Sequence, residues 1–280
     1  MAVLLKKMKE GYDFLFYELG DHRTQDMFPS GLFLVIILPA YLYFSKSYGP
    51  RIMKDLKPFK LRSILYYYNL FQIFICLYIT YLGIKGGWFN GYSFKCQSVD
   101  YTENVQSRSM INAVWWYTVV KLIDLMDTVF FVLRKKDRQI SFLHLFHHFM
   151  MPIASFVCLK FYPNGHATFL GLINCIVHIV MYTYYFIAGL GPKYQKYLWW
   201  KKHVTAMQLI QFSIIFLHNL IGYYDSSCAY PKWIHVVLCI HSLQFVYMFG
   251  NFYYENYIKI RNQSQKRQLL TSFEEKMKNK

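Results

Sequence analysis

Long apolar segments constrain this chain more than any other feature. Of its 280 residues, 55% are apolar and 20% are aromatic. The apolar residues fall in blocks long enough to cross a hydrocarbon core of roughly 30 Å as helices of about 20 residues. The blocks lack the alternating pattern of barrel strands, so we expect an all-α integral membrane protein with one domain over residues 1–280. Seven transmembrane helices are predicted, at Met27–Phe44, Ser63–Ile84, Met110–Leu133, Gln139–Phe161, His166–Leu190, His203–Gly222 and Trp233–Tyr254.

The distribution of basic residues predicts how these helices are oriented. The formal charge is +16, and its concentration on one side of the predicted helices favours an anionic membrane face over nucleic acid as a partner. Segments 45–62, 134–138, 191–202 and 255–280 hold 21 Lys and Arg, against 9 on the other side. By the positive-inside rule, we expect a basic cytosolic tail at 255–280 and a luminal N-terminal arm at 1–26.

Lysines and cysteines indicate the compartment. Lys276 and Lys278 are arranged as in a cytosolic dilysine retrieval signal, and their agreement with the predicted topology favours that interpretation over a merely solvated tail. We therefore expect a multi-pass protein of the endoplasmic reticulum membrane. Cys96 and Cys228 fall in two predicted luminal loops, where the compartment is oxidising and a disulfide persists. We predict that these two cysteines pair.

Three histidines lie within one turn of the fourth predicted helix. His144, His147 and His148 are spaced i, i+3 and i+4, which places their imidazoles on one face. Polar rings in an apolar helix require partners, and ionisable groups inside a membrane are functional by default. A metal centre and nucleophilic or acid/base catalysis both suit such a cluster. Ten histidines with only one such box are too few to ligate two irons, so we expect no metal.

Three further helices carry polar residues at a matching depth. Counted at about 1.5 Å per residue, these residues and the histidines lie roughly 5 to 18 Å from the cytosolic ends. Lys121 and Asp124 share a face at i and i+3 and are suited to an internal ion pair. His218, His235 and His241 are interpreted as hydrogen-bonding residues of helix packing. The other residues at this depth are Asp127, His178, Gln208 and Gln211, and the same helices also carry Thr128 and Asn174.

Four motifs stand out along the chain. They are the segment Lys121–Lys136, His144-Leu145-Phe146-His147-His148, Asn174-x-x-x-His178-x-x-Met181-Tyr182-x-Tyr184-Tyr185 and Thr205-x-x-Gln208-x-x-Gln211. In this order, and over nearly all of the chain, they resemble one family, the very-long-chain fatty acid elongases of the endoplasmic reticulum. The family usually has Glu where this chain has Asp124, and the shorter side chain alters the pairing with Lys121.

The resemblance implies both a fold and a reaction. Seven transmembrane helices are expected, six of them surrounding a narrow acyl tunnel. Long-chain acyl-CoA and malonyl-CoA would condense to a 3-oxoacyl-CoA two carbons longer, with carbon dioxide and free CoA, and with no cofactor beyond these substrates. The expected partners are the 3-oxoacyl-CoA reductase, 3-hydroxyacyl-CoA dehydratase and enoyl-CoA reductase of the same cycle. A monomer and a homo-oligomer are both compatible with the sequence.

Roles follow from this resemblance and from imidazole chemistry. We expect His147 to be the nucleophile that attacks the thioester, and His144 and His148 to orient that nucleophile or carry protons. Lys121 and Asp124 are expected to position donors or polarise a ring. Asn174, His178 and Gln208 are expected to stabilise the enolate. The residues expected to bind CoA phosphates are Arg134, Lys135, Lys136, Lys201 and Lys202. The other residues expected to contact substrate are Tyr182, Tyr185 and Gln211.

Three alternatives stay open. In the first, the histidines act only as base and acid in a ternary complex of enzyme with both substrates. The second is a histidine-box di-iron desaturase or hydroxylase, and the third is a non-catalytic seven-span receptor that binds lipid.

Overall fold

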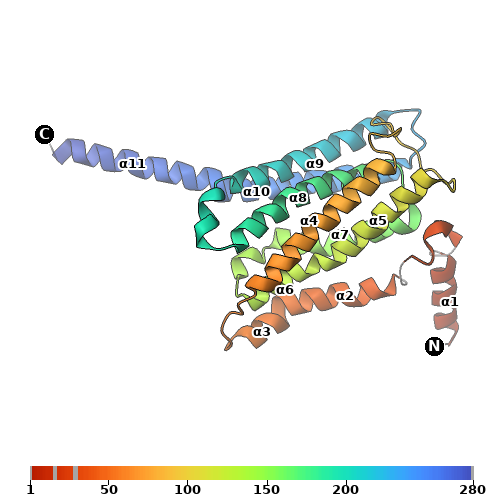
Figure 1. Ribbon diagram of the computed structural model, residues 1–280, viewed down its shortest axis with the longest axis horizontal. Helices are drawn as coiled ribbons and strands as arrows, with labels where there is room; N and C mark the ends of the chain where they lie inside the picture. Colours follow the sequence, from red (N-terminus) through yellow and green to blue (C-terminus); the bar gives the residue numbers. More distant parts are fainter. Residues whose placement is uncertain (1, 15–17, 28–30, 279–280) are drawn as a thin grey trace.

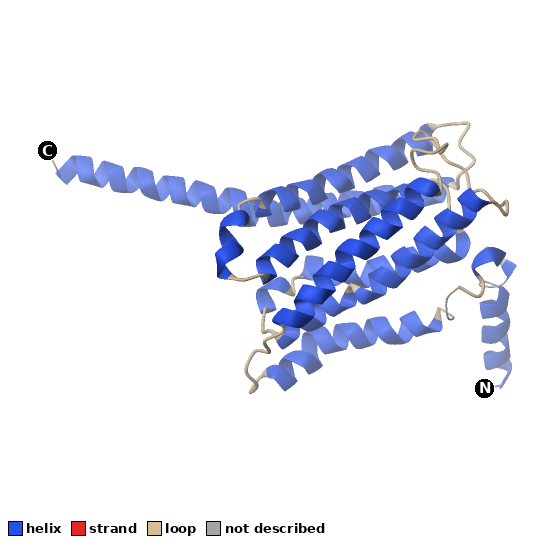
Figure 2. Ribbon diagram, viewed as in Figure 1, coloured by secondary structure: helices blue, strands red, loops and turns tan. Residues whose placement is uncertain are grey.

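The computed structural model describes residues 2–14, 18–27 and 31–278, and its secondary structure over these residues is entirely helical (Figure 2). Long helices run side by side in one bundle, and the two ends of the chain lie at opposite ends of it (Figure 1). The helices of the bundle are α2 (Leu32–Tyr43), α4 (Arg62–Lys85), α5 (Val105–Ile123), α6 (Leu125–Leu133), α7 (Phe142–Phe161), α8 (Thr168–Gly189), α9 (Lys201–Tyr224) and α10 (Lys232–Tyr253).

Shorter or peripheral helices complete the chain. Helix α1 (Ala2–Asp13) lies across one end of the bundle, and α11 (Lys259–Lys278) projects from the other (Figure 1). The predicted basic tail is therefore helical as far as Lys278. The remaining elements are η2 (His22–Thr24), η3 (Phe44–Tyr48), α3 (Gly49–Met53), η4 (Asp137–Gln139), η5 (Pro192–Tyr197) and η6 (Tyr254–Ile258).

Six of the described helical segments are long and apolar enough to cross a membrane. Their outward faces are rich in exposed apolar side chains such as Val35, Ile36 and Ile210, as expected where lipid replaces water. The protein is thus a multi-pass membrane protein. The segments are Leu32–Met53, α4, α7, α8, α9 and Lys232–Gln263.

The third predicted span is not one continuous helix. Helices α5 and α6 meet at Asp124, where the chain tightens because the Asp127 amide donates to the Asp124 carbonyl at 3.1 Å, three residues back. Helix α6 has only 9 residues. The part of the chain that the structure describes therefore contains six long apolar helical segments, and the third predicted span corresponds in sequence to α5 and α6.

Six helices form a closed ring. Around it, α4 packs on α5 and α8, α5 on α7, α8 on α9, and α9 on α10. The ring closes between α7 and α10, where the Phe146 and Phe245 ring centroids are 6.0 Å apart. Helix α2 packs outside the ring, against α7.

The two ends of the bundle differ in character. We call the end that carries segments 86–104, 162–167 and 225–231 the loop end, and the end that carries segments 54–61, 134–141 and 190–200 the basic end. At the loop end, a disulfide joins Cys96 to Cys228 with their Cα atoms 5.5 Å apart, which confirms the predicted pairing.

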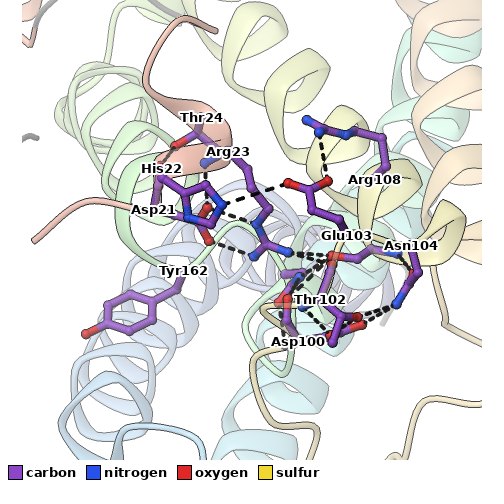
Figure 3. A network of polar contacts seen from close by, with 12 residues as sticks. Asp21, His22, Arg23, Thr24, Asp100, Thr102, Glu103, Asn104, Arg108 and Tyr162 are labelled. Atoms are coloured by element: carbon purple, nitrogen blue, oxygen red, sulfur yellow. Dashed lines mark hydrogen bonds and ion pairs between the residues drawn. The ribbon is translucent and has the colours of Figure 1, made fainter.

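Arg23 fastens the N-terminal arm to the loop end, where it donates through Nη1 to the Thr102 carbonyl at 3.1 Å, and it forms a buried ion pair with Asp21 inside the arm (Figure 3). The Nη2 atom of Arg23 lies 2.6 Å from Oδ2 of Asp21, and both side chains are fully buried. Arg23 also donates through Nη1 to Ser107 Oγ at 2.8 Å, and Lys160 Nζ donates to the Thr24 carbonyl at 2.9 Å. Burial alone raises the pKa of Asp21, but hydrogen bonds and the charge of Arg23 lower it below its ordinary value.

Candidate active site

A largely apolar cavity lies inside the ring of six helices. Its wall is formed by side chains of α4, α5, α7, α8, α9 and α10 together with Ala167. Most lining residues are aliphatic, aromatic or methionine, for example Ile79, Met151 and Leu172. Such a cavity suits the hydrocarbon part of a ligand.

Polar groups are sparse in this wall. His147 of α7, Asn174 of α8 and Gln211 of α9 all line the cavity. The Gln211 Oε1 atom is buried without a hydrogen-bond partner among the described residues. A buried acceptor without a partner is costly unless a ligand or water meets it. These three predicted residues are thus brought together on one surface.

The start of α7 sets the position of the histidine cluster. Ser141 caps the helix, and its Oγ accepts from the His144 amide at 3.2 Å. This N-cap satisfies one of the free amides of the first turn. The cluster therefore occupies the first two turns of α7, near the basic end.

The three histidines have different surroundings. Nε2 of His144 lies 2.7 Å from the Thr128 hydroxyl, which in turn lies 2.7 Å from the Tyr41 hydroxyl of α2. His148 lies beneath His144 with ring centroids 4.2 Å apart, and its Nδ1 is buried without a partner among the described residues. His147 alone of the three lines the cavity, with its ring 5.5 Å from that of Phe245.

An ion pair occupies the junction of α5 and α6. Lys121 Nζ lies 2.9 Å from Asp124 Oδ2, and the two side chains are 2% and 3% exposed. The other carboxylate oxygen accepts from Gln72 Nε2 at 2.7 Å and from the Tyr182 hydroxyl at 3.2 Å. Tyr182 also donates to Asp127 Oδ2 at 2.9 Å. The pair that the i, i+3 spacing predicted is therefore formed, with partners from two further helices.

Three other predicted residues contact protein groups in the structure. Tyr182, which is predicted to contact substrate, is fully buried, and its hydroxyl binds the two carboxylates. Gln208 was expected to face the enolate, and its Nε2 donates to Met181 Sδ at 3.5 Å. His178 is buried, and its Nδ1 has no partner among the described residues. The ring of His178 lies 5.6 Å from that of Tyr182.

The basic residues expected to meet CoA lie at the basic end. Arg134, Lys135 and Lys136 follow α6, while Lys201 and Lys202 begin α9. Lys136, Lys201 and Lys202 are exposed, whereas Lys135 donates to the Lys54 carbonyl at 3.0 Å. Tyr185 is 43% exposed. The side chains of Lys276 and Lys278 lie outside the part of the chain that is described.

Three residues of the site were missed by sequence reasoning. Gln72 was a polar residue inside a predicted span, and that signal could have identified it. Tyr41 and Tyr117 carried no such signal, because this chain has 26 tyrosines. Tyr117 nevertheless lines the cavity and donates to Asn174 Oδ1 at 2.9 Å.

A multi-pass membrane protein with an apolar cavity and polar side chains on its wall can hold an acyl chain beside reactive groups. Comparison with known proteins shows which class this is. Residues 27–266 match the model of the ELO family, described as GNS1/SUR4. The chain belongs to this family of fatty acid elongases.

Relatives from animals are similar over most of their length. The chain is 39% identical to very long chain fatty acid elongase 7 of Drosophila melanogaster over 252 residues, 89% of this chain and 77% of the relative. It is 41% identical to very long chain fatty acid elongase 1 of Mus musculus over 252 residues, 88% of this chain and 90% of the relative. It is 43% identical to very long chain fatty acid elongase 1 of Homo sapiens over 232 residues, which are 82% of this chain and 83% of the relative. These likenesses support an enzyme of fatty acid elongation.

Proposed function

We propose that this elongase catalyses the condensing step, in which a long-chain acyl-CoA and malonyl-CoA give a 3-oxoacyl-CoA two carbons longer. The observation that carries the proposal is the position of His147 on the wall of an apolar cavity enclosed by six helices. An acyl chain in the cavity would place its thioester beside this imidazole. Proximity of this kind makes the attack effectively unimolecular.

The first half-reaction forms a covalent intermediate. A neutral His147 nitrogen attacks the thioester carbon, the carbon–sulfur bond breaks, and CoA leaves as its thiolate. The acyl-imidazole keeps the chain in the cavity while CoA departs. His148 lies with its ring 5.4 Å from that of His147, and His144 contacts His148, so both can orient the nucleophile or accept its proton.

The second half-reaction joins the two substrates. Malonyl-CoA loses carbon dioxide, and the electron pair of the broken carbon–carbon bond forms an enolate. The enolate carbon attacks the acyl carbon, and the bond to His147 breaks to restore the imidazole. The enolate oxygen needs hydrogen-bond donors in a dry site, and Asn174 with His178 supplies them in this proposal.

The basic end would receive the CoA moieties. Exposed Lys136, Lys201 and Lys202 surround it together with Arg134, and cationic side chains bind phosphate oxygens by charge-assisted hydrogen bonds. Both substrates would enter from this side, with no cofactor required.

Purified protein incubated with acyl-CoA and labelled malonyl-CoA tests the proposal. Label in a 3-oxoacyl-CoA supports it, and an intact protein that transfers no label to lipid refutes it.

Incubation with acyl-CoA alone separates the covalent route from the ternary complex. Free CoA together with acylated protein supports the covalent route, whereas neither product supports the ternary complex. Membership of the elongase family disfavours the desaturase and receptor alternatives.

Topology and location complete the proposal. Seven crossings, with α5 and α6 forming the third, place the basic end and α11 in the cytosol and the loop end in the lumen. Lys276 and Lys278 would retain the protein in the endoplasmic reticulum, where the reductases and dehydratase of the cycle act on its product. Protease protection of sealed microsomes tests this, because a tag after α11 should be digested without detergent.

A further inference from the structure

Tyr117 connects the buried ion pair to the cavity wall. Lys121 lies one turn further along α5, and its Nζ atom is 4.9 Å from the centroid of the Tyr117 ring. The Tyr117 hydroxyl donates to Asn174 Oδ1 on α8 at 2.9 Å. Tyr117 and Asn174 are 6% and 4% exposed, and both line the cavity that His147 also lines. A series of contacts thus runs from Asp124 through Lys121 and Tyr117 to Asn174.

This hydrogen bond selects one orientation of the Asn174 amide. A side-chain amide can rotate by half a turn, which exchanges its acceptor oxygen for its two N–H donors. With Oδ1 held by Tyr117, the Nδ2 group is left free, and it has no hydrogen-bond partner among the described residues. The rotated amide would instead present its carbonyl oxygen to the cavity, where it would repel a developing negative charge.

Lys121 strengthens this selection. A cation over an aromatic face draws on the electron density of the ring. The Tyr117 hydroxyl therefore becomes a better donor and a poorer acceptor. The rotated state, in which Tyr117 would accept from Nδ2, is therefore disfavoured.

We propose that Tyr117 is a positioning residue for the condensation, and that it holds the Asn174 N–H groups toward the oxygen of the enolate. This inference rests on the proposed function and adds a specific role for a residue outside the elongase motifs. Tyr117 acts through Asn174 and does not itself contact the reacting atoms. Removing one preorganised donor costs roughly 10²–10³ in kcat in other enzymes. Releasing the amide to rotate should cost less, about tenfold to a hundredfold.

The first test is Tyr117→Phe, which keeps the ring and removes only the hydroxyl. We expect kcat for condensation to fall about tenfold to a hundredfold, with the KM for acyl-CoA unchanged. Release of CoA from acyl-CoA alone should persist, which also shows that the variant is folded. A purely structural role would instead lower both half-reactions together. Tyr78→Phe is the matched control, because Tyr78 of α4 is 45% exposed and contacts Trp116 by its ring.

A double-mutant cycle decides whether Tyr117 acts through Asn174. In an Asn174→Ala background, Tyr117→Phe should cause no further loss of condensation, and equal losses in both backgrounds would overturn the inference. Asn174→Asp keeps an acceptor for Tyr117 but removes the donors, so it should lose condensation and retain CoA release even if Tyr117→Phe fails to fold. Retained condensation in Asn174→Asp also overturns the inference. If the unaltered protein forms no product, it is the proposed function that fails; if it does and Tyr117→Phe matches it, only the role of Tyr117 fails.

Discussion

Lys121 and Asp124 form an ion pair of 2.9 Å inside the helix ring, where at most 3% of either side chain is exposed. Gln72 and Tyr182 bind the second oxygen of the same carboxylate. Removal of one partner from a buried pair leaves an uncompensated charge, which costs about 3–5 kcal/mol. Substituting one or both residues of the pair therefore separates the stability cost of an unpaired charge from the loss of catalysis.

Lys121→Met should lower the free energy of unfolding by about 3–5 kcal/mol. The double variant Lys121→Met/Asp124→Asn should recover much of that loss, because it carries neither buried charge. Neither variant should condense substrates at the normal rate. Denaturant unfolding in detergent and product formation measure the two effects. A double variant as unstable as Lys121→Met would contradict this account.

His147→Ala should abolish transfer of labelled malonyl carbon and should form no acyl-protein. The expected loss is roughly 10⁴-fold or more, as when an enzyme loses its nucleophile. His22→Ala is the control, since the His22 side chain is 71% exposed at the far end of the bundle. Near-normal turnover by a folded His147→Ala protein would remove this residue from the nucleophile role.

The Cys96–Cys228 disulfide should contribute about 2–5 kcal/mol, the range for a native disulfide. It joins residues 132 positions apart. Reducing agent should lower the Tm of the unaltered protein to that of Cys96→Ala/Cys228→Ala and leave the double variant unchanged. Cys239→Ala, which removes a free cysteine, should respond to reductant as the unaltered protein does.

Asp21→Asn should destabilise the protein at pH 7 by about 1–3 kcal/mol, because Arg23 loses a charged partner. The pKa of Asp21 is lowered in the folded protein. The stabilisation is therefore complete above the ordinary Asp pKa near 3.9 and is lost as the pH falls through the lower folded value. Tm measured against pH should show a gap between the two proteins that closes only in acid. A gap independent of pH would assign the effect to packing.

Sequence patterns predicted most of the long helices to within a few residues, although the first predicted span ended at Phe44 and the helical segment continues to Met53. The fifth predicted span was His166–Leu190, and α8 runs from Thr168 to Gly189, because an apolar run and its flanking turns are local properties. The break at Asp124 was missed. It depends on partners that arrive from other helices, such as Gln72 of α4, and these are set by tertiary packing.

In the candidate site, too, features that depend on local spacing were predicted, whereas features that depend on tertiary contacts were not. Spacing alone placed His144, His147 and His148 on one face, as the structure has them. Which imidazole reaches the cavity depends on partners from other helices. The Thr128 hydroxyl of α6 lies 2.7 Å from His144 Nε2, whereas His147 lies beside Phe245 of α10 on the cavity wall. The hydrogen bond from Tyr117 to Asn174 joins residues 57 positions apart, and no local pattern distinguishes this tyrosine from the rest.

Helix α11 continues the chain beyond the bundle for 20 residues, about 30 Å at helical rise. A flexible coil of that length would have a similar mean reach of roughly 25 Å, but in no fixed direction. The helix is a rigid extension that points away from the basic end (Figure 1). A protein that recognises this segment would meet it at a set distance from the basic end and would not have to order a mobile chain first. Lengthening or shortening α11 by one turn would shift the position of such a binding site by about 5 Å without changing the cavity.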